Sequence, residues 1–343
     1  MEMLLQPVDD ASAWTGPNLA QDESWIYHLT SAEVRDLEAT LRKAIKEGLE
    51  PDLVRREDFE LSVLGPTLSR IGQQIEFGRG LALVRGLPIQ GHTVEALEIM
   101  FAGVVSHLGK LIVQNTRGTL IDRVTDLGLS YDGVTVRGYT TNAKLTPHCD
   151  SGDLAALYCV RQAKSGGVNN LASAMTIYNE ILKYHPELLE ALYLGFHYHL
   201  RGGGPPGEWA NVTRHRVPIY SYFKGRLSCR YNKNMICKAA ELPNFGPLTD
   251  EEQRAVDILA EIAMRPEIRL DVLLVPGELL LLNNNSVLHN RESFIDHSEP
   301  DRKRLLLRAW IHTPIARELE DKFADHYNTG AGQGPHVYGD SAE

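Results

Sequence analysis

The chain of 343 residues contains a short motif whose side chains could bind a metal ion, His148-Cys149-Asp150. Apolar residues on both sides of it predict that the motif lies at the end of a β-strand, where residues i and i+2 point to the same face. His148 and Asp150 would then converge, while Cys149 points away. One more histidine would complete a 2-His-1-carboxylate set, which leaves positions on iron open for substrates and dioxygen. A His-x-Asp triplet alone is more often an accident of the surface or core.

A candidate for the second histidine follows far along the chain. The apolar run 279–282 is followed by three asparagines, and the chain then presents His289. Only the fold could bring His289 to His148 and Asp150. The alternative is a structural histidine near a strand end, with the asparagines serving as turn residues.

Two arginines in the segment 304–311 strengthen the metal hypothesis. The apolar residues of this segment require burial, and as a strand it would place Arg304 and Arg308 on one face. Two buried guanidinium groups are costly unless anions meet them. Because guanidinium forks match carboxylates, the pair predicts carboxylates of small molecules at the metal. The alternative is an exposed strand face paired with Asp or Glu.

Composition limits the partners and the compartment. The net charge of -10 argues against nucleic acid and anionic membranes. The sequence has no 18-residue apolar run and no secretory signal, and its four cysteines are too scattered for a disulfide scaffold. We therefore expect free thiols in a reducing compartment and a cytoplasmic protein. Homo-oligomerisation is left open.

Hydrophobic periodicity and turn residues predict the elements. The expected helices are 31–46, 66–77, 93–108, 174–184, 186–193, 249–264 and 316–327. The expected strands are 81–86, 111–113, 134–140, 155–161, 195–200, 219–223, 226–231, 268–274, 278–282, 286–289 and 304–312. Strands dominate from 110 to 312 without regular βαβα alternation, which predicts a mainly β fold with flanking helices (α+β), a jelly-roll barrel. We expect one domain, with an N-terminal arm and helices (1–79), a jelly-roll core (80–312) and a C-terminal helix and tail (313–343).

Four motifs occur in order, and their order is more specific than any one of them. They are His148-Cys149-Asp150, Lys164-Ser165-Gly166-Gly167, the segment 283–294 around His289, and the segment 303–311 with both arginines. Over residues 80–312 the chain resembles the taurine dioxygenase-like (TauD/TfdA, clavaminate synthase-like) family of Fe(II)- and 2-oxoglutarate-dependent oxygenases. The resemblance implies a double-stranded β-helix with iron held by His148, Asp150 and His289.

The resemblance also implies roles for cofactor-binding residues. Arg304 matches the family arginine that binds the distal carboxylate of 2-oxoglutarate. Arg308 matches the one near the metal-bound end of the co-substrate or near an acidic substrate. The chain departs from the family at Cys149, where threonine is usual, and at Asn169, which replaces a Thr or Ser that also holds the distal carboxylate. Because an asparagine can still donate a hydrogen bond, we expect co-substrate binding to be kept.

Expectations for the substrate pocket are less specific. Besides Arg308, we expect that Gln114, Tyr139 and Asn142 could line it, although each also fits a structural role. The segment 201–209 fits either a mobile lid or a plain surface loop.

The function implied is oxidation of an unactivated C–H bond in a small, carboxylate-bearing substrate such as an amino acid or another organic acid. Fe(II), 2-oxoglutarate and O2 are the implied cofactors, succinate and CO2 are released, and the outcome is hydroxylation or else desaturation or cyclisation. One alternative is a cupin-type metalloenzyme that does not use 2-oxoglutarate, but it would not need Arg304 and Arg308. The other is a catalytically inactive binding relative, against which the intact His-Asp-His set argues.

Overall fold

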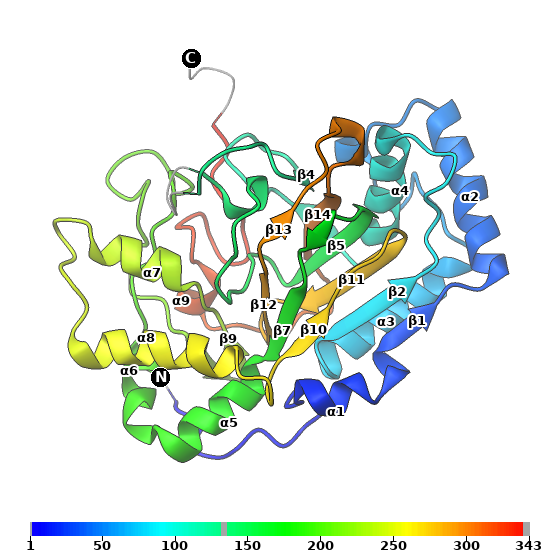
Figure 1. Ribbon diagram of the computed structural model, residues 1–343. Helices are drawn as coiled ribbons and strands as arrows, with labels where there is room; N and C mark the ends of the chain where they lie inside the picture. The colour runs from blue at the N-terminus through cyan, green and yellow to red at the C-terminus, as the bar shows by residue number, and fades with distance from the viewer. Residues whose placement is uncertain (1, 132–135, 339–343) are drawn as a thin grey trace.

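The protein, seen here as a computed structural model, is described over residues 2–131 and 136–338 (Figure 1). The α-helices are α1 (Gly16–Ala20), α2 (Ser31–Lys46), α3 (Leu64–Phe77), α4 (Val94–Ser106), α5 (Ala174–Tyr184), α6 (Leu189–Leu194), α7 (Lys233–Ala240), α8 (Asp250–Ala263) and α9 (Asp321–Ala324). The strands are β1 (Ile26–His28), β2 (Leu81–Arg85), β3 (Lys110–Ile112), β4 (Ile121–Val124), β5 (Leu154–Arg161), β6 (Ser165–Gly166), β7 (Asn169–Ser173), β8 (Tyr220–Phe223), β9 (Arg226–Cys229), β10 (Leu270–Val272), β11 (Glu278–Asn283), β12 (Val287–Arg291), β13 (Phe294–Ile295) and β14 (Leu305–His312). Among the described residues, no helix combines the length and apolar character that a membrane crossing requires.

Helix α2 shows how local sequence sets an element. Thr30 accepts a hydrogen bond from the Glu33 backbone N–H, and the Glu33 carboxylate accepts one from the Thr30 backbone, which forms a capping box. Leu37 and Leu41 recur at helical spacing and are fully buried. The helix ends as predicted, just before Gly48, whose φ of 71° suits glycine.

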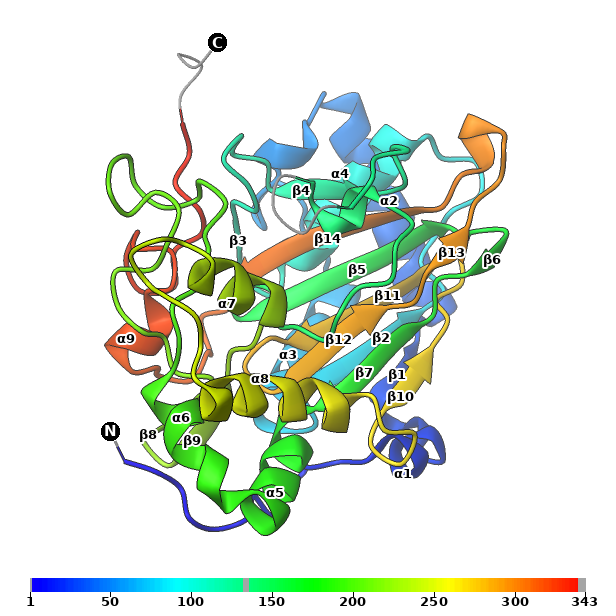
Figure 2. The same ribbon diagram turned by 60° about the vertical axis from the view of Figure 1, so that its left-hand side comes forward.

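The larger sheet carries the strands that lead to the predicted site. Its order is β1-β2-β11-β5-β14-β3, and β4 also pairs with β14 (Figure 2). β1 is parallel to β2, and the other pairings are antiparallel. On β14, Leu305 and Leu307 pack towards α2, α3 and α4, whereas Leu306 and Trp310 face the other way, as period-2 alternation predicts.

A second, smaller sheet of order β10-β7-β12 faces the larger one. Apolar side chains from both sheets form one buried cluster between them, including Leu157 and Leu280 from the larger sheet and Leu171 and Val287 from the smaller. Helices α5, α6 and α8 pack in a separate cluster with the β8–β9 hairpin. Two facing sheets with helices outside form the double-stranded β-helix that was expected.

Two predicted strands differ from the structure. The strand expected at 134–140 falls partly on 132–135, outside the described residues, and Gly138–Thr140 forms a 3₁₀ helix. In place of the strand expected at 195–200, Phe196 and His199 make only isolated bridges.

The prediction of a C-terminal helix at 316–327 was also wrong, because only Asp321–Ala324 of this segment is helical. Arg317 explains the difference, since its backbone N–H and its Nε both donate to Glu76 Oε1 at 3.1 Å. Glu76 is buried, so this contact anchors the chain against α3 in a non-helical path.

Candidate metal centre

Backbone hydrogen bonds bring the two predicted histidines together. His289 lies in the middle of β12, and its N–H donates to the His148 carbonyl at 2.9 Å while the His148 N–H donates to the His289 carbonyl at 3.0 Å. The motif His148-Cys149-Asp150 was predicted to lie at the end of a strand, and this prediction was wrong. His148 and Asp150 belong to an extended segment before β5 that is held by isolated bridges to His289 and Asn232. The side chains of this segment still alternate in direction, as predicted. Cys149 Sγ lies 3.8 Å from the Cys229 carbonyl oxygen and belongs to the apolar cluster with α5, α6 and α8, away from the metal-binding set.

His148, Asp150 and His289 form a compact set of ligand atoms. One ligand atom from each lies within 4.8 Å of the others, so the three could hold a metal ion. His148 Nε2 lies 3.8 Å from Asp150 Oδ1, and His289 Nε2 lies 3.7 Å from Asp150 Oδ2. A hydrogen bond of 2.8 Å between His148 Nδ1 and the Thr146 carbonyl fixes the tautomer that leaves Nε2 free to ligate.

The protonation states suit metal binding. Burial alone would raise the pKa of Asp150, but Arg308, His289 and His148 together lower it to about 2. Burial, reinforced by the neighbouring His148, lowers the pKa of His289 to about 3. The set therefore presents an ionised carboxylate and a neutral imidazole at neutral pH, the forms that bind metals.

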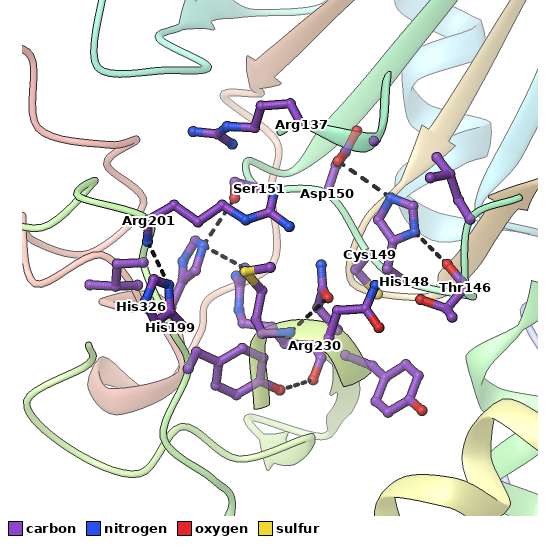
Figure 3. A pocket seen from close by; sticks show the side chains of 18 of the residues that line it. Arg137, Thr146, His148, Cys149, Asp150, Ser151, His199, Arg201, Arg230 and His326 are labelled. Carbon is purple, nitrogen blue, oxygen red and sulfur yellow. Dashed lines mark hydrogen bonds and ion pairs between the residues drawn. The ribbon is translucent and has the colours of Figure 1, made fainter. Parts of the chain in front are cut away.

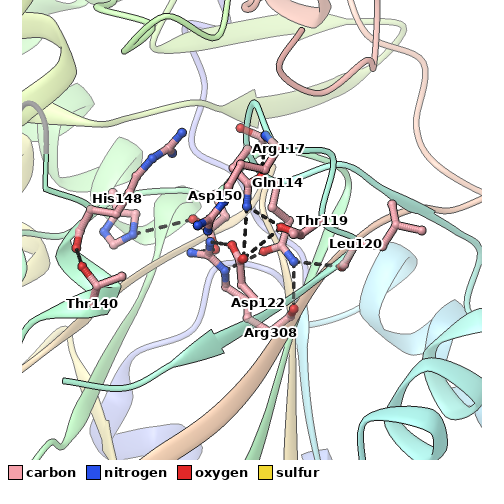
Figure 4. A network of polar contacts seen from close by, with 12 residues as sticks. Gln114, Arg117, Thr119, Leu120, Asp122, Thr140, His148, Asp150 and Arg308 are labelled. Carbon is pink, nitrogen blue, oxygen red and sulfur yellow. Dashed lines mark hydrogen bonds and ion pairs between the residues drawn. The ribbon is translucent and has the colours of Figure 1, made fainter. Parts of the chain in front are cut away.

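Arg308 lies against this set and is matched by the protein's own carboxylates (Figure 4). Its Nη2 lies 3.3 Å from Asp122 Oδ2, and its Nη1 lies 3.5 Å from Asp150 Oδ2. Its Nε donates to Gln114 Oε1 at 2.7 Å, and Gln114 Nε2 donates back to the Arg308 carbonyl at 2.8 Å. Gln114 is completely buried behind Arg308 and, contrary to the expectation for the substrate pocket, lines neither of the two cavities that reach the metal-binding set. Asp122, on β4, was not identified from the sequence because neither β4 nor its pairing was predicted.

Unlike Arg308, Arg304 has no carboxylate paired with its guanidinium among the described residues. It is 4% exposed, and its Nη1 has no hydrogen-bond partner among the described residues. Burial lowers its pKa to about 10, against the opposing influence of Cys159 and Asp296. Asp296 Oδ1 accepts the Arg304 backbone N–H at 2.8 Å. The Arg304 guanidinium is therefore a buried cation with unused hydrogen-bonding capacity.

Arg304 opens into a cavity of about 50 Å³, hereafter the Arg304 cavity, which reaches the metal-binding set. It is lined in part by Asp150, Asn169, His289, Arg291 and Arg304. The Asn169 Nδ2 already donates to the Val272 carbonyl at 3.2 Å. Arg291 was not predicted as a site residue, although its position two residues after His289 on one strand was a usable signal. Burial and the nearby Arg304 lower the pKa of Arg291 to about 9.

A second cavity, of about 140 Å³, is also lined by His148 and Asp150 (Figure 3). We call it the Arg230 cavity; its lining includes Arg137, Tyr139, Arg201, Arg230, Arg308 and His326. Tyr139 lines both cavities and stacks under Arg308, with the guanidinium carbon 4.5 Å from the ring centroid. Asn142 is exposed and lines neither cavity. Of the segment 201–209, Arg201 alone is part of the lining.

The fold and the site together define a class, that of metal-dependent oxygenases built on a double-stranded β-helix. The match to known proteins is more specific. Residues 44–310 match the model of the "Taurine catabolism dioxygenase TauD, TfdA family", and the chain belongs to this family. It is accordingly an Fe(II)- and 2-oxoglutarate-dependent dioxygenase, with Fe(II), 2-oxoglutarate and O2 as cofactors, as the resemblance implied.

Relatives agree with this assignment. The chain is 33% identical over 329 residues to the FR-33289 synthase of Streptomyces rubellomurinus, covering 95% of this chain and 96% of the relative. Solved structures share the fold at lower identity. An asparagine oxygenase in complex with Fe(II), hydroxyasparagine and succinate aligns with a TM-score of 0.67 at 16% identity, over 84% of this chain and 94% of its own. The non-heme iron oxygenase OrfP with Fe and alpha-ketoglutaric acid aligns with a TM-score of 0.61 at 15% identity, over 91% of this chain and all of its own.

Proposed function

We propose that His148, Asp150 and His289 bind Fe(II) and that Arg304 binds the distal carboxylate of 2-oxoglutarate. One observation carries the proposal: the three ligand atoms lie within 4.8 Å of one another beside a cavity that ends at a buried, underused guanidinium. A dicarboxylate that reaches from metal to arginine would satisfy both ends of this cavity. Such a charge-assisted fork is geometrically specific.

The other residues of the Arg304 cavity would position the co-substrate. Asn169 lies at the position of the family Thr or Ser, and its amide nitrogen carries two N–H bonds, one of which donates to the Val272 carbonyl, so the second could donate to the distal carboxylate. Arg308 lines both cavities and is placed to contact the metal-bound end of the co-substrate or an acidic group of the substrate. Because Asp122 and Asp150 already match its charge, its first task would be to hold Asp150 in place.

Bound iron, with 2-oxoglutarate and O2, supplies the oxidation of an unactivated C–H bond with release of succinate and CO2. The protein would orient the substrate and keep water away from the reacting centre. In the Arg230 cavity, the substrate would lie next to His148 and Asp150 and away from Arg304, which does not line that cavity.

We infer a small organic acid or amino acid as the substrate. Arginines from several segments reach the Arg230 cavity, which favours an acidic molecule. The names of the solved relatives support the class, since one is an asparagine oxygenase and OrfP has been crystallised with L-Arg. Its oxidation would end in hydroxylation, or in desaturation or cyclisation. We further propose that the chain forms a single catalytic domain and works in the cytoplasm, in keeping with four cysteines that are all free.

Anaerobic titration tests this function. Adding Fe(II) and then 2-oxoglutarate should produce the visible charge-transfer band of the chelate. A cupin-type enzyme that does not use 2-oxoglutarate, or an inactive relative without the iron site, would give no such band. A decarboxylation screen over amino acids and other organic acids would then identify the substrate through succinate release.

A further inference from the structure

Trp310 carries a buried hydrogen-bond donor beside the metal-binding set. Its side chain is buried and lines the Arg230 cavity together with Asp150 and Arg308. The indole Nε1 is buried as well, and it makes no hydrogen bond to any described residue. Because a buried N–H without a partner is costly, a buried indole usually has an acceptor nearby. The setting of Trp310 therefore calls for one.

Asp150 offers a buried acceptor that also lacks a partner. Its Oδ2 has no hydrogen-bond partner in the described part of the chain, and its contact with Arg308 Nη1, at 3.5 Å, is an ion pair without a hydrogen bond. Burial raises the pKa of Asp150, Arg308 and the two ligand histidines lower it, and the Trp310 indole, which can donate to the carboxylate, lowers it further. The free donor and the free acceptor can therefore satisfy each other.

Strand β14 fixes the position of the indole. Trp310 lies two residues after Arg308, so both side chains project from the same face of the strand. The Trp310 backbone is paired with Ala155 of β5 on one side and with Ile112 of β3 on the other. Because β5 begins just after the segment that carries Asp150, one sheet holds both the donor and the carboxylate.

Arg308 links the indole to the carboxylate in a second way. Its guanidinium carbon lies 4.5 Å from the ring centroid of Tyr139 and 5.0 Å from that of Trp310. Aromatic faces attract cations at such distances. The same guanidinium pairs with Asp122 and Asp150 (Figure 4), so the rings and the carboxylates together restrict its position. Trp310 can therefore act on Asp150 both directly and through Arg308.

The number of Asp150 oxygens on the metal decides how much of the metal stays open. A carboxylate that binds through one oxygen leaves room for the co-substrate and O2, whereas binding through both oxygens takes one of these positions. Oδ2 is the oxygen that pairs with Arg308 and lacks a hydrogen bond, so Oδ1 is the one left for the metal. A donor at Oδ2 would keep this oxygen off the metal and hold the carboxylate in its ligating orientation.

We propose that Trp310 is a positioning residue whose indole N–H donates to Asp150 Oδ2 and so leaves Oδ1 alone to bind the metal. This inference rests on the proposed function, because it assumes that the metal-binding set holds Fe(II). Trp310 acts through Asp150, so its effects should be measurable before any substrate is added. This separates the role from a simple contact between the indole and the substrate.

Trp310→Phe tests the proposal, because it keeps an aromatic ring near Arg308 and removes the N–H. The measurements are the Fe(II) dissociation constant, obtained anaerobically by competition with a chromophoric chelator, and the position of the charge-transfer band after 2-oxoglutarate is added. We expect Fe(II) binding to weaken by roughly tenfold, at the lower end of the about 10–100-fold effect of losing such a supporting partner. The band should move to longer wavelength, because a carboxylate without the donor gives more charge to the iron.

A second variant separates the N–H from the packing of the ring. β-(3-Benzothienyl)alanine, incorporated at position 310 by nonsense suppression, has the shape of tryptophan but carries sulfur in place of the N–H. It should reproduce both effects of Trp310→Phe, and it serves as the test if Trp310→Phe does not fold by circular dichroism. A benzothienyl variant with wild-type iron affinity and band position would assign any effect of Trp310→Phe to packing and would overturn the proposal.

Trp25→Phe is the matched control. Trp25 is also buried, and its Nε1 donates to the Leu19 carbonyl at 3.2 Å, so this variant loses an indole hydrogen bond elsewhere in the fold. It directly precedes β1, and β2, β11 and β5 lie between β1 and β14. Its iron affinity and its charge-transfer band should match those of the wild type.

The same samples separate this proposal from the proposed function. Absence of the charge-transfer band in the wild-type enzyme with Fe(II) and 2-oxoglutarate would refute the iron and co-substrate assignment. A normal wild-type band, with the same band and the same iron affinity in folded Trp310→Phe, would refute the role of Trp310 alone.

Discussion

Removal of the Arg304 side chain should weaken 2-oxoglutarate binding more than any other single arginine substitution. Arg304 is 4% exposed, its Nη1 has no partner among the described residues, and it ends the cavity that begins at the metal-binding set. Truncating one partner of a buried, hydrogen-bonded charge pair costs about 2–5 kcal/mol. Since about 1.4 kcal/mol is tenfold, Arg304→Ala should raise the dissociation constant of 2-oxoglutarate by roughly 30-fold or more. Arg291 shares the cavity and keeps part of the attraction, which favours the lower end of this range.

The assay is an anaerobic titration of each Fe(II)-loaded variant with 2-oxoglutarate, followed by the charge-transfer band. Arg304→Lys should restore binding only in part, because an ammonium group cannot reproduce the planar fork. Arg302→Ala is a matched control two residues away, since the Arg302 side chain is 57% exposed and pairs with Glu299 on the surface. Arg308→Ala should chiefly weaken substrate binding or uncouple the reaction, with a smaller effect on 2-oxoglutarate.

Protein stability provides an internal check on this reasoning. Burial lowers the pKa of Arg304 to about 10, so the folded protein disfavours this cation when no anion meets it. Arg304→Ala should therefore leave the melting temperature of the metal-free protein close to that of the wild type. Unchanged 2-oxoglutarate binding in a folded, iron-loaded Arg304→Ala enzyme would refute the co-substrate assignment. Equal weakening by Arg308→Ala would refute the separate roles of the two arginines.

Three further substitutions test other parts of the structure. His289→Ala should abolish iron binding, measured by metal analysis, and succinate formation while the circular dichroism spectrum stays unchanged; retained turnover would exclude it as a ligand. Asp122→Asn should leave Arg308 short of a buried carboxylate and lower the free energy of unfolding in urea by on the order of 3 kcal/mol, and an unchanged midpoint would show that this pair is dispensable. His312 Nδ1 lies 2.7 Å from Asp153 Oδ2, and this hydrogen bond raises the pKa of His312. Its stabilisation is therefore complete below the unfolded pKa of about 6.5 and is lost as the pH rises through the higher folded value. His312→Gln should lower stability at pH 5.5 by at most about 1 kcal/mol, because the ring is half exposed, and should have less effect at pH 8.5; equal effects at both pH values would contradict the ion pair.

Elements with strong local signals could be predicted from the sequence. The acidic first turn and the apolar periodicity after it place α2 correctly, although the N-cap is Thr30 and not the expected Ser31. The long apolar strands β5, β11 and β14 were also predicted within one or two residues, because a fully buried strand is a nearly continuous apolar run.

Strand β7 shows why other elements could not be predicted. Its sequence, Asn-Asn-Leu-Ala-Ser, has weak strand propensity, yet all five residues are buried. Tertiary contacts decide, since Asn170 Nδ2 donates to Asp271 Oδ1 at 2.7 Å and Asn170 Oδ1 accepts from Asn290 Nδ2 at 2.9 Å. Such partners lie about a hundred residues away along the chain, so no local pattern reveals them.

Three of the buried arginines, Arg230, Arg304 and Arg308, show what burial can predict and what it cannot. The cost of a buried guanidinium predicts an anion at each position, but not which anion. For Arg308 the anions are Asp122 and Asp150, so the expectation that it needs a ligand carboxylate was not required by its charge. Arg304 and Arg230 are also buried, but no carboxylate among the described residues pairs with their guanidinium groups. The same energetic argument that accounts for Asp122 beside Arg308 therefore assigns ligand anions to the other two, one in each of the two cavities beside the metal-binding set.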